Sequence, residues 1–184
     1  MLALELLTKR SSMPRLQAPA PSAEQLQVMF SAAARAPDHG QLMPYRFIVF
    51  NQHQLPVLAQ FFGQAAQQQQ LNPLEVERAQ QLPLRAPLVI VALAHYQQHD
   101  KVPQWEQLAS AVCATSLLQQ AAFAQGLGAI WRTGWLTEST LLKQQLKLHD
   151  NEAIIGFMYV GTPAVDTPTK PDKDWSGKVQ FWGS

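Results

Sequence analysis

The stretch APLVIVALA, at residues 86–94, is the feature that most restricts the fold of this chain. Every residue in it is apolar, whereas a strand with one face in water alternates apolar and polar side chains. The run therefore predicts a central strand that is covered on both faces. It is far shorter than the about 20 apolar residues that a membrane-spanning helix needs.

The rest of the chain supplies neighbours for such a strand. YRFIVFN and AIIGFMYVG predict further strands, and AIWRTGW predicts a strand or an extended segment. Ser22, with Gln25 three residues later, is typical of a capping box at the start of a helix. The predicted helices cover residues 2–9, the segment after Ser22, and residues 55–71, 73–82, 105–128 and 137–148, the last with Thr137 as its N-cap. This mixture predicts an α+β or α/β sandwich, and because no repeat or linker divides it, we expect a single domain over residues 1–184.

The predicted helix at residues 105–128 has small and apolar residues nearly all the way round. A helix without a clear polar face is buried from several sides. We therefore expect it to form either the core of the domain or the contact between two subunits. Cys113, in the middle of this helix, is expected to be a small core residue.

The pattern changes after Thr162. Prolines interrupt the segment, which rules out long helices, yet Trp175, Phe181 and Trp182 are costly to leave in water. We interpret residues 162–184 as an extended C-terminal arm that docks on another surface.

Composition excludes several function classes. The net charge of +1 and the lack of a basic stripe argue against nucleic-acid binding. The single cysteine cannot form an internal disulfide, and no Cys/His group has zinc spacing, so no metal site is predicted. The N-terminal MLALELLTKR contains Glu5 between short apolar bursts and is atypical of a signal peptide. We expect a cytoplasmic protein that does not associate with membranes.

Two polar clusters are candidates for ligand binding. KRSSMPRL, at residues 9–16, offers the cations and hydroxyls that a phosphate or polyol needs, although cations at a helix end also offset the helix dipole. Arg132 follows a predicted strand and precedes a glycine, where it could face a ligand or form a surface ion pair. The glycines of GLGAIW close a helix rather than open one, so they favour a helix cap over a dinucleotide fingerprint. No catalytic Ser-His-Asp or Cys-His arrangement is visible.

Four stretches together resemble the flavin-dependent nitroreductase family, and most closely its small bacterial NAD(P)H nitroreductase branch. They are LLTKRSSMPRL, ARAPDHGQLMPYRFIVF, AAFAQGLGAIWRTG and IIGFMYVGTP, in this order. The resemblance implies an α+β fold with a central, mostly antiparallel sheet flanked by helices, and a homodimer that exchanges its C-terminal arms. It further implies FMN at the subunit interface and NADH or NADPH as co-substrate. The implied reaction passes hydride to small electrophilic acceptors such as nitroaromatics or quinones, in a ping-pong sequence.

The resemblance also implies site residues, since the flavin carries the chemistry and no catalytic side chain is required. Arg10, Ser11 and Ser12 match the segment that binds the FMN phosphate and ribityl chain, and Trp131, Arg132 and Thr133 match a second phosphate-side segment. Arg35 and His39 match positions that touch FMN from the other subunit. The match to the nicotinamide-nucleotide region consists of Ala121, Ala122, Phe123, Ala124, Gln125 and Gly126.

Three alternatives remain open from the sequence. The same scaffold could carry a different reductive reaction. The protein could instead store or sense FMN with little turnover. It could also be a structural dimer without a ligand, in which case the purified protein would be colourless.

Overall fold

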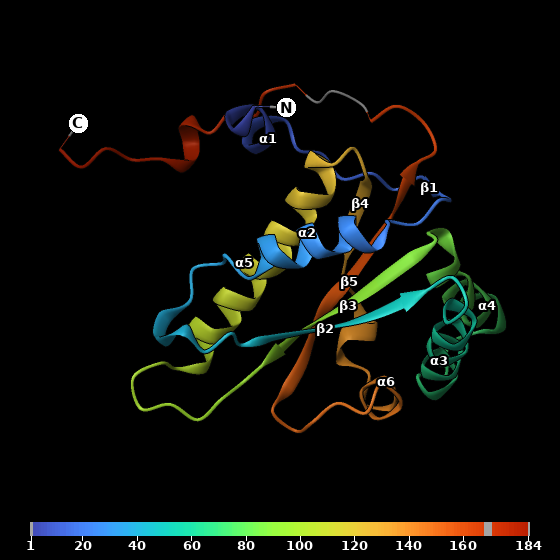
Figure 1. Ribbon diagram of the computed structural model, residues 1–184. Coiled ribbons are helices and arrows are strands. Elements are labelled where there is room, and N and C mark those ends of the chain that lie inside the picture. The colour runs from blue at the N-terminus through green and yellow to red at the C-terminus, as the bar shows by residue number, and fades with distance from the viewer. Residues whose placement is uncertain (1, 168–170, 184) are drawn as a thin grey trace.

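The computed structural model describes residues 2–167 and 171–183 and shows a sheet with helices on both faces (Figure 1). The helices are α1 (Ala3–Lys9), α2 (Ala23–Ala33), α3 (Leu55–Gln68), α4 (Pro73–Gln81), α5 (Gln104–Ala124) and α6 (Thr140–Gln145). The strands are β1 (Leu16–Gln17), β2 (Tyr45–Asn51), β3 (Leu88–His95), β4 (Gly128–Arg132) and β5 (Glu152–Pro163). The capping box of Ser22 and Gln25 opens α2 as expected.

Strand β3 lies in the middle of the sheet. It pairs antiparallel with β2 on one side and with β5 on the other, while β5 also pairs antiparallel with β4 and with β1. All residues of β3 from Leu88 to Ala94 are buried. The continuous apolar run is therefore a central strand covered on both faces, which confirms the prediction.

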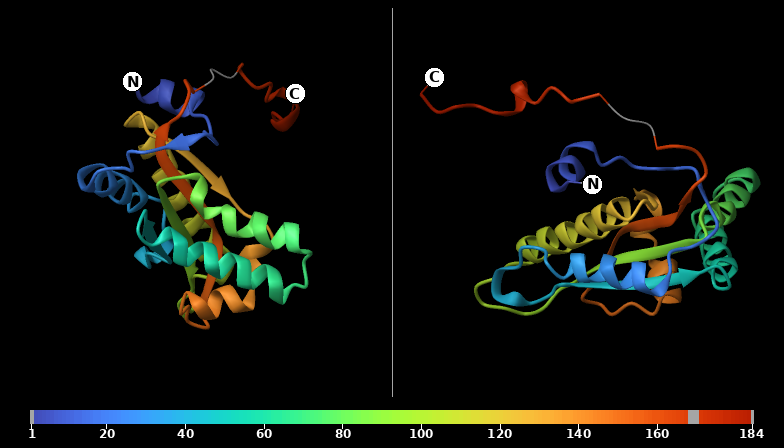
Figure 2. Two further views of the ribbon diagram at one scale, coloured as in Figure 1. Left: turned by 90° about the vertical axis from the view of Figure 1, so that its right-hand side faces the viewer. Right: turned by 45° about the horizontal axis from the view of Figure 1, so that its top comes forward.

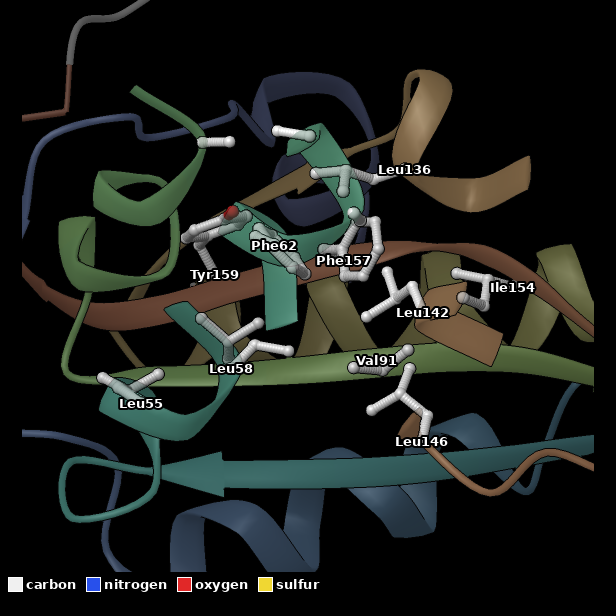
Figure 3. Close-up of a cluster of buried hydrophobic side chains, with 14 of the residues drawn as sticks. Leu55, Leu58, Phe62, Val91, Leu136, Leu142, Leu146, Ile154, Phe157 and Tyr159 are labelled. Carbon is white, nitrogen blue, oxygen red and sulfur yellow. The ribbon is translucent and has the colours of Figure 1, made fainter. Parts of the chain in front are cut away.

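Alternate residues of the central strands enter two separate cores. On one face, Val91 of β3 and Phe157 and Tyr159 of β5 pack against Phe62 of α3 and Leu142 of α6 (Figure 3). The rings of Phe62 and Phe157 meet edge to face at 5.0 Å. On the opposite face, the intervening residues of the same strands pack against α2 and α5. Figures 1 and 2 show the two layers, with α3, α4 and α6 on one side of the sheet and α2 and α5 on the other.

Helix α5 is unusual in the side chains that it buries. Its sheet-facing side includes the buried polar residues Gln107, Thr115 and Gln119. Its outer side exposes Trp105, Leu108 and Val112 at 69%, 37% and 38%. The polar side chains inside are satisfied by hydrogen bonds; Gln107, for example, bonds Gln97 through its amide oxygen and nitrogen. The apolar side chains outside form a surface that the chain itself does not cover.

Three expectations need correction. The helix near residue 140 begins at Thr140 with Ser139 as its N-cap, not at Thr137. Thr137 lies in a short 3₁₀ turn, where its hydroxyl donates to the Gly134 carbonyl oxygen instead of capping a helix. Cys113 is exposed on α5 rather than buried in the core.

The third correction concerns the start of the C-terminal arm, because residues 162 and 163 still belong to β5 and pair with β1. Residues 171–183 are exposed; the first of them border a cavity beside α1, and the segment then runs outward (Figure 2). Residues 168–170 and 184 of the predicted arm, and residue 1 of the predicted domain, lie outside the described residues. Within the described part of the chain, no helix combines the length and apolarity needed to cross a membrane.

Candidate functional site

The segment after α1 lies along β4 and borders a cavity. The backbone N–H of Met13 donates to the Ala129 carbonyl oxygen over 2.9 Å, which fixes the segment to the strand. A cavity of about 580 Å³ opens beside this contact. It is lined by Ser11, Ser12, Met13, Pro14, Arg15, Ile130 and Val165. The predicted phosphate-binding hydroxyls therefore do border a space that could admit part of a ligand.

Two polar atoms of this segment are buried without a hydrogen-bond partner in the described chain. They are Nη1 of Arg10 and Oγ of Ser11. A buried donor without an acceptor costs free energy, more so when it carries charge. A second cavity, of about 670 Å³, reaches Arg10 and is lined by Lys9 and Lys173 and also by the acidic Asp172. Unpaired donors next to cavities in which cations outnumber acids fit an anionic ligand with several acceptor oxygens, such as a phosphate group.

The end of β4 presents two side chains to opposite faces of the sheet. Trp131 packs against the core under α2 and α5, and its Nε1 donates to the Ile155 carbonyl oxygen over 3.2 Å. The guanidinium of Arg132 lies 5.8 Å from the centre of the Tyr159 ring on the other face. Burial raises the pKa of Tyr159 to about 12, although nearby Arg132 and Arg85 act in the opposite direction. Tyr159 is therefore un-ionised at neutral pH, and its ring makes a cation–π contact with Arg132.

The loop between α2 and β2 carries Arg35 and His39. His39 Nδ1 lies 2.6 Å from Oε2 of Glu106, near the start of α5. The backbone of Gln41 and Met43 has positive φ values of 54° and 48°, a conformation unfavourable for residues with side chains. The Asp38 carboxylate holds this loop by accepting a 2.6 Å bond from the Met43 N–H.

A cavity of about 460 Å³ lies beside this loop. It is lined by Ala34, Arg35, Ala36, Asp38, Gln41, Met43 and Tyr45. The loop predicted to bind a ligand therefore borders a cavity, and Arg35 is one of the residues that line it.

One chain does not bring the two groups of predicted residues together. His39 bonds α5 at Glu106, while Ser12 bonds α5 at Gln119. Because these helix positions are 13 residues apart, they are separated by roughly 20 Å along the axis. The loop with Arg35 and His39 and the segment with Arg10 and Ser12 lie toward opposite ends of α5 (Figure 1). Within one chain the two groups of residues therefore lie apart.

The predicted nicotinamide-nucleotide segment spans the end of α5 and the turn that follows. Ala121 and Ala122 are buried in the core, whereas Ala124 and Gly126 are exposed. Gln125 donates from its amide to the backbone oxygens of Gln25 and Ala121. The accessible part of this segment is therefore its C-terminal turn, where Gly126 adopts φ of 77° and ends the helix.

Two polar groups escaped the sequence analysis. The first is Gln119, which contacts both Ser12 and β4 but in sequence is one glutamine among several.

The second is Glu152. It accepts two hydrogen bonds from Arg46, at 2.6 and 2.7 Å, and further bonds from His95 and the His149 N–H. The sequence signal that could have identified Glu152 is its position as a single acidic residue at the start of an apolar strand. Burial by itself raises the pKa of Glu152, but these bonds outweigh it and lower that pKa to about 2.

Comparison with known proteins identifies the family. The family model described as "Nitroreductase family" matches residues 7–162. The Escherichia coli K12 protein named "Putative NAD(P)H nitroreductase YdjA" is 41% identical over 167 residues, which cover 91% of each chain.

Solved structures share the fold. A nitroreductase-like family protein from Bacillus cereus superposes with a TM-score of 0.85 at 17% identity, covering 100% of this chain and 97% of its own. An FMN-dependent nitroreductase from Clostridium difficile gives a TM-score of 0.72 at 22% identity, covering 98% of this chain and 99% of its own. From the match over residues 7–162 and the identity to the Escherichia coli relative, this chain belongs to the nitroreductase family.

Proposed function

We propose that this protein is an FMN-dependent oxidoreductase that passes hydride from NADH or NADPH to small electrophilic acceptors such as nitroaromatics or quinones. The observation that carries the proposal is the pair of buried, unpartnered donors, Ser11 Oγ beside the cavity that Ser12 also lines and Arg10 Nη1 beside the second cavity. A relative bears the name "Putative NAD(P)H nitroreductase YdjA" and a structural neighbour is titled an FMN-dependent nitroreductase, which supports the choice of cofactors. The proposed location is the cytoplasm, where these nucleotides are available.

In this proposal each residue group has a separate role. Arg10, Ser11 and Ser12 hold the phosphate and ribityl chain, and the end of β4, with Trp131, Arg132 and Thr133, borders them. The terminal turn of residues 121–126 contacts the nicotinamide nucleotide. FMN, when bound, supplies the hydride chemistry, so the protein has to bind, orient and shield it.

We further propose that the site is shared between the subunits of a homodimer. The outer side of α5 exposes a tryptophan, a leucine and a valine, and the C-terminal arm exposes Trp175 and Trp182 at 64% and 98%. Obligate subunit interfaces are large and apolar, which fits these surfaces. Arg35 and His39 lie far from Arg10 within one chain, and a second chain could place them at the same ligand.

Steady-state kinetics test the proposed activity. The FMN-saturated protein should oxidise NADH or NADPH in the presence of a nitroaromatic or quinone acceptor. When both substrates are varied, double-reciprocal plots should give parallel lines, because one site serves the two substrates in turn. Intersecting lines would contradict a single site that serves the two substrates in turn, and flavin binding without turnover would favour a storage or sensor protein.

A further inference from the structure

Gln119 joins the N-terminal segment to β4 from inside the domain. It lies on the sheet-facing side of α5 with a 7% exposed fraction. Its Nε2 is 3.2 Å from the Ala129 carbonyl oxygen and 3.4 Å from Oγ of Ser12. One buried amide therefore contacts both the strand and a hydroxyl that lines the cavity.

The orientation of this amide follows from its partners. A carbonyl oxygen only accepts hydrogen bonds, so the nitrogen of Gln119, and not its oxygen, must face Ala129. The Ala129 oxygen also accepts from the Met13 N–H, so both of its lone pairs are engaged. An amide nitrogen carries two hydrogens, and the second is directed toward Ser12.

The bond to Ser12 determines what that hydroxyl can do next. Because Ser12 Oγ accepts from Gln119, its own hydrogen remains for another partner, and within the described residues this hydroxyl donates to no side chain or backbone oxygen. A hydroxyl held in this way presents a donor to the cavity. A donor suits a phosphate, which only accepts hydrogen bonds when fully ionised.

We propose that Gln119 is a positioning residue that orients the Ser12 hydroxyl as a donor to the phosphate of the bound flavin nucleotide. The inference rests on the proposed function, because it takes FMN as the ligand. It extends that function, because a buried helix residue that does not touch FMN would determine how well the FMN phosphate is bound.

The substitution Gln119→Glu tests the direction of the hydrogen bond with little change in shape. A carboxylate would put an oxygen against the Ala129 carbonyl oxygen and would accept the hydrogen of Ser12, so that the donor turns away from the cavity. Gln120→Glu is the matched control, since it adds the same charge one residue further along α5. Gln120 bonds only Ser116 in its own helix among the described residues.

The readout is the dissociation constant of the apoprotein for FMN and for riboflavin, which lacks the phosphate. Gln119→Glu should weaken FMN binding at least about tenfold, the effect of losing one charge-assisted bond, and leave riboflavin binding unchanged. Gln120→Glu should alter neither constant. An equal loss for both flavins would show a merely structural role, and an unchanged FMN constant would remove Gln119 from phosphate recognition; either result overturns the inference.

A double-mutant cycle provides the test if Gln119→Glu fails to fold. Gln119→Met should weaken FMN binding in the natural background but have no further effect when combined with Ser12→Ala, because Gln119 acts through that hydroxyl. Additive losses would overturn the inference. A natural protein that binds neither flavin would contradict the proposed function itself, which distinguishes the two failures.

Discussion

The indole of Trp131 lies directly over the backbone of Gly156. A Cβ atom at position 156 would be 2.0 Å from Nε1 of Trp131 and 2.8 Å from the Arg132 carbonyl oxygen. Gly156 also has φ of 150° and sits at the irregularity in the pairing of β5 with β3. The lack of a side chain at this position lets Trp131 bond Ile155 and brings the end of β4 against β5.

Gly156→Ala should therefore displace Trp131 and the end of β4. We expect a loss of about 1–3 kcal/mol in the free energy of unfolding, as for an overpacked core, and weaker FMN binding. Urea denaturation and flavin titration measure the two effects. Gly177→Ala is the control, because nothing lies within 4 Å of the added Cβ there. A Gly156→Ala protein with unchanged stability and affinity would show that this contact is unimportant.

Glu152 and Arg46 predict how stability depends on pH. The folded-state pKa of Glu152 is lowered from 4.5 to about 2, so its contribution is fully present above about pH 4.5 and is lost as the pH falls toward 2. We expect the loss to be about 2 kcal/mol, allowing for the partly exposed Arg46.

Urea denaturation at fixed protein concentration across this pH range measures the loss. Glu152→Gln should destabilise the protein by about 3 kcal/mol at pH 7, since it leaves Arg46 and His95 without their partner. It should also flatten the dependence between pH 4.5 and 2. The exposed Glu77→Gln on α4 serves as the control and should do neither. A Glu152→Gln protein with the natural pH dependence would contradict the assignment.

The outer side of α5 predicts an obligate homodimer. Leu108→Asp together with Val112→Asp should dissociate it, because two charges in an apolar interface would lose their hydration. Sedimentation at micromolar concentration measures the mass, and flavin titration should show that the monomer binds FMN poorly. Val57→Asp on α3, where the valine is 45% exposed, is a matched control and should leave a dimer. A natural protein that sediments as a flavin-loaded monomer would refute the shared site.

Arg132→Glu should weaken FMN binding while leaving the fold intact. A charge-assisted bond to phosphate contributes about 1.5–3 kcal/mol, and reversal of the charge adds repulsion, so the dissociation constant should rise more than tenfold. Circular dichroism checks the fold. Arg78→Glu makes the same change in charge on exposed α4 and should have no effect. If Arg132→Glu retains its FMN affinity, Arg132 is not a phosphate ligand.

Much of the fold could be predicted because short sequence patterns specify the same helices and strands that the tertiary packing requires. The continuous run of β3 and the capping box of α2 each have a signature within a few residues, and the structure confirms both. The start of α6 was wrongly predicted at Thr137, because residues 135–138 form a 3₁₀ turn whose Leu136 packs into the core, and the helix is capped by Ser139.

The site was predictable only in part for a related reason. Arg10, Ser11 and Ser12 are neighbours in sequence, so their chemistry shows in a short motif. Gln119 contacts Ser12 from 107 positions away, and Trp131 packs over a glycine 25 residues later in the chain. Such pairings arise from the sheet register and from helix packing, which no local pattern encodes. The exposure of Cys113 likewise depends on which side of α5 faces the sheet.

Identification of the flavin tests the central claim most directly. The protein should be purified, saturated with a mixture of FMN, FAD and riboflavin, freed of excess ligand and denatured by heat, and the released flavin identified by chromatography. The account predicts FMN at one molecule per subunit, because it assigns Arg10, Ser11, Ser12 and Arg132 to a single terminal phosphate. Release of FAD or riboflavin in preference to FMN, or of no flavin at all, would contradict it.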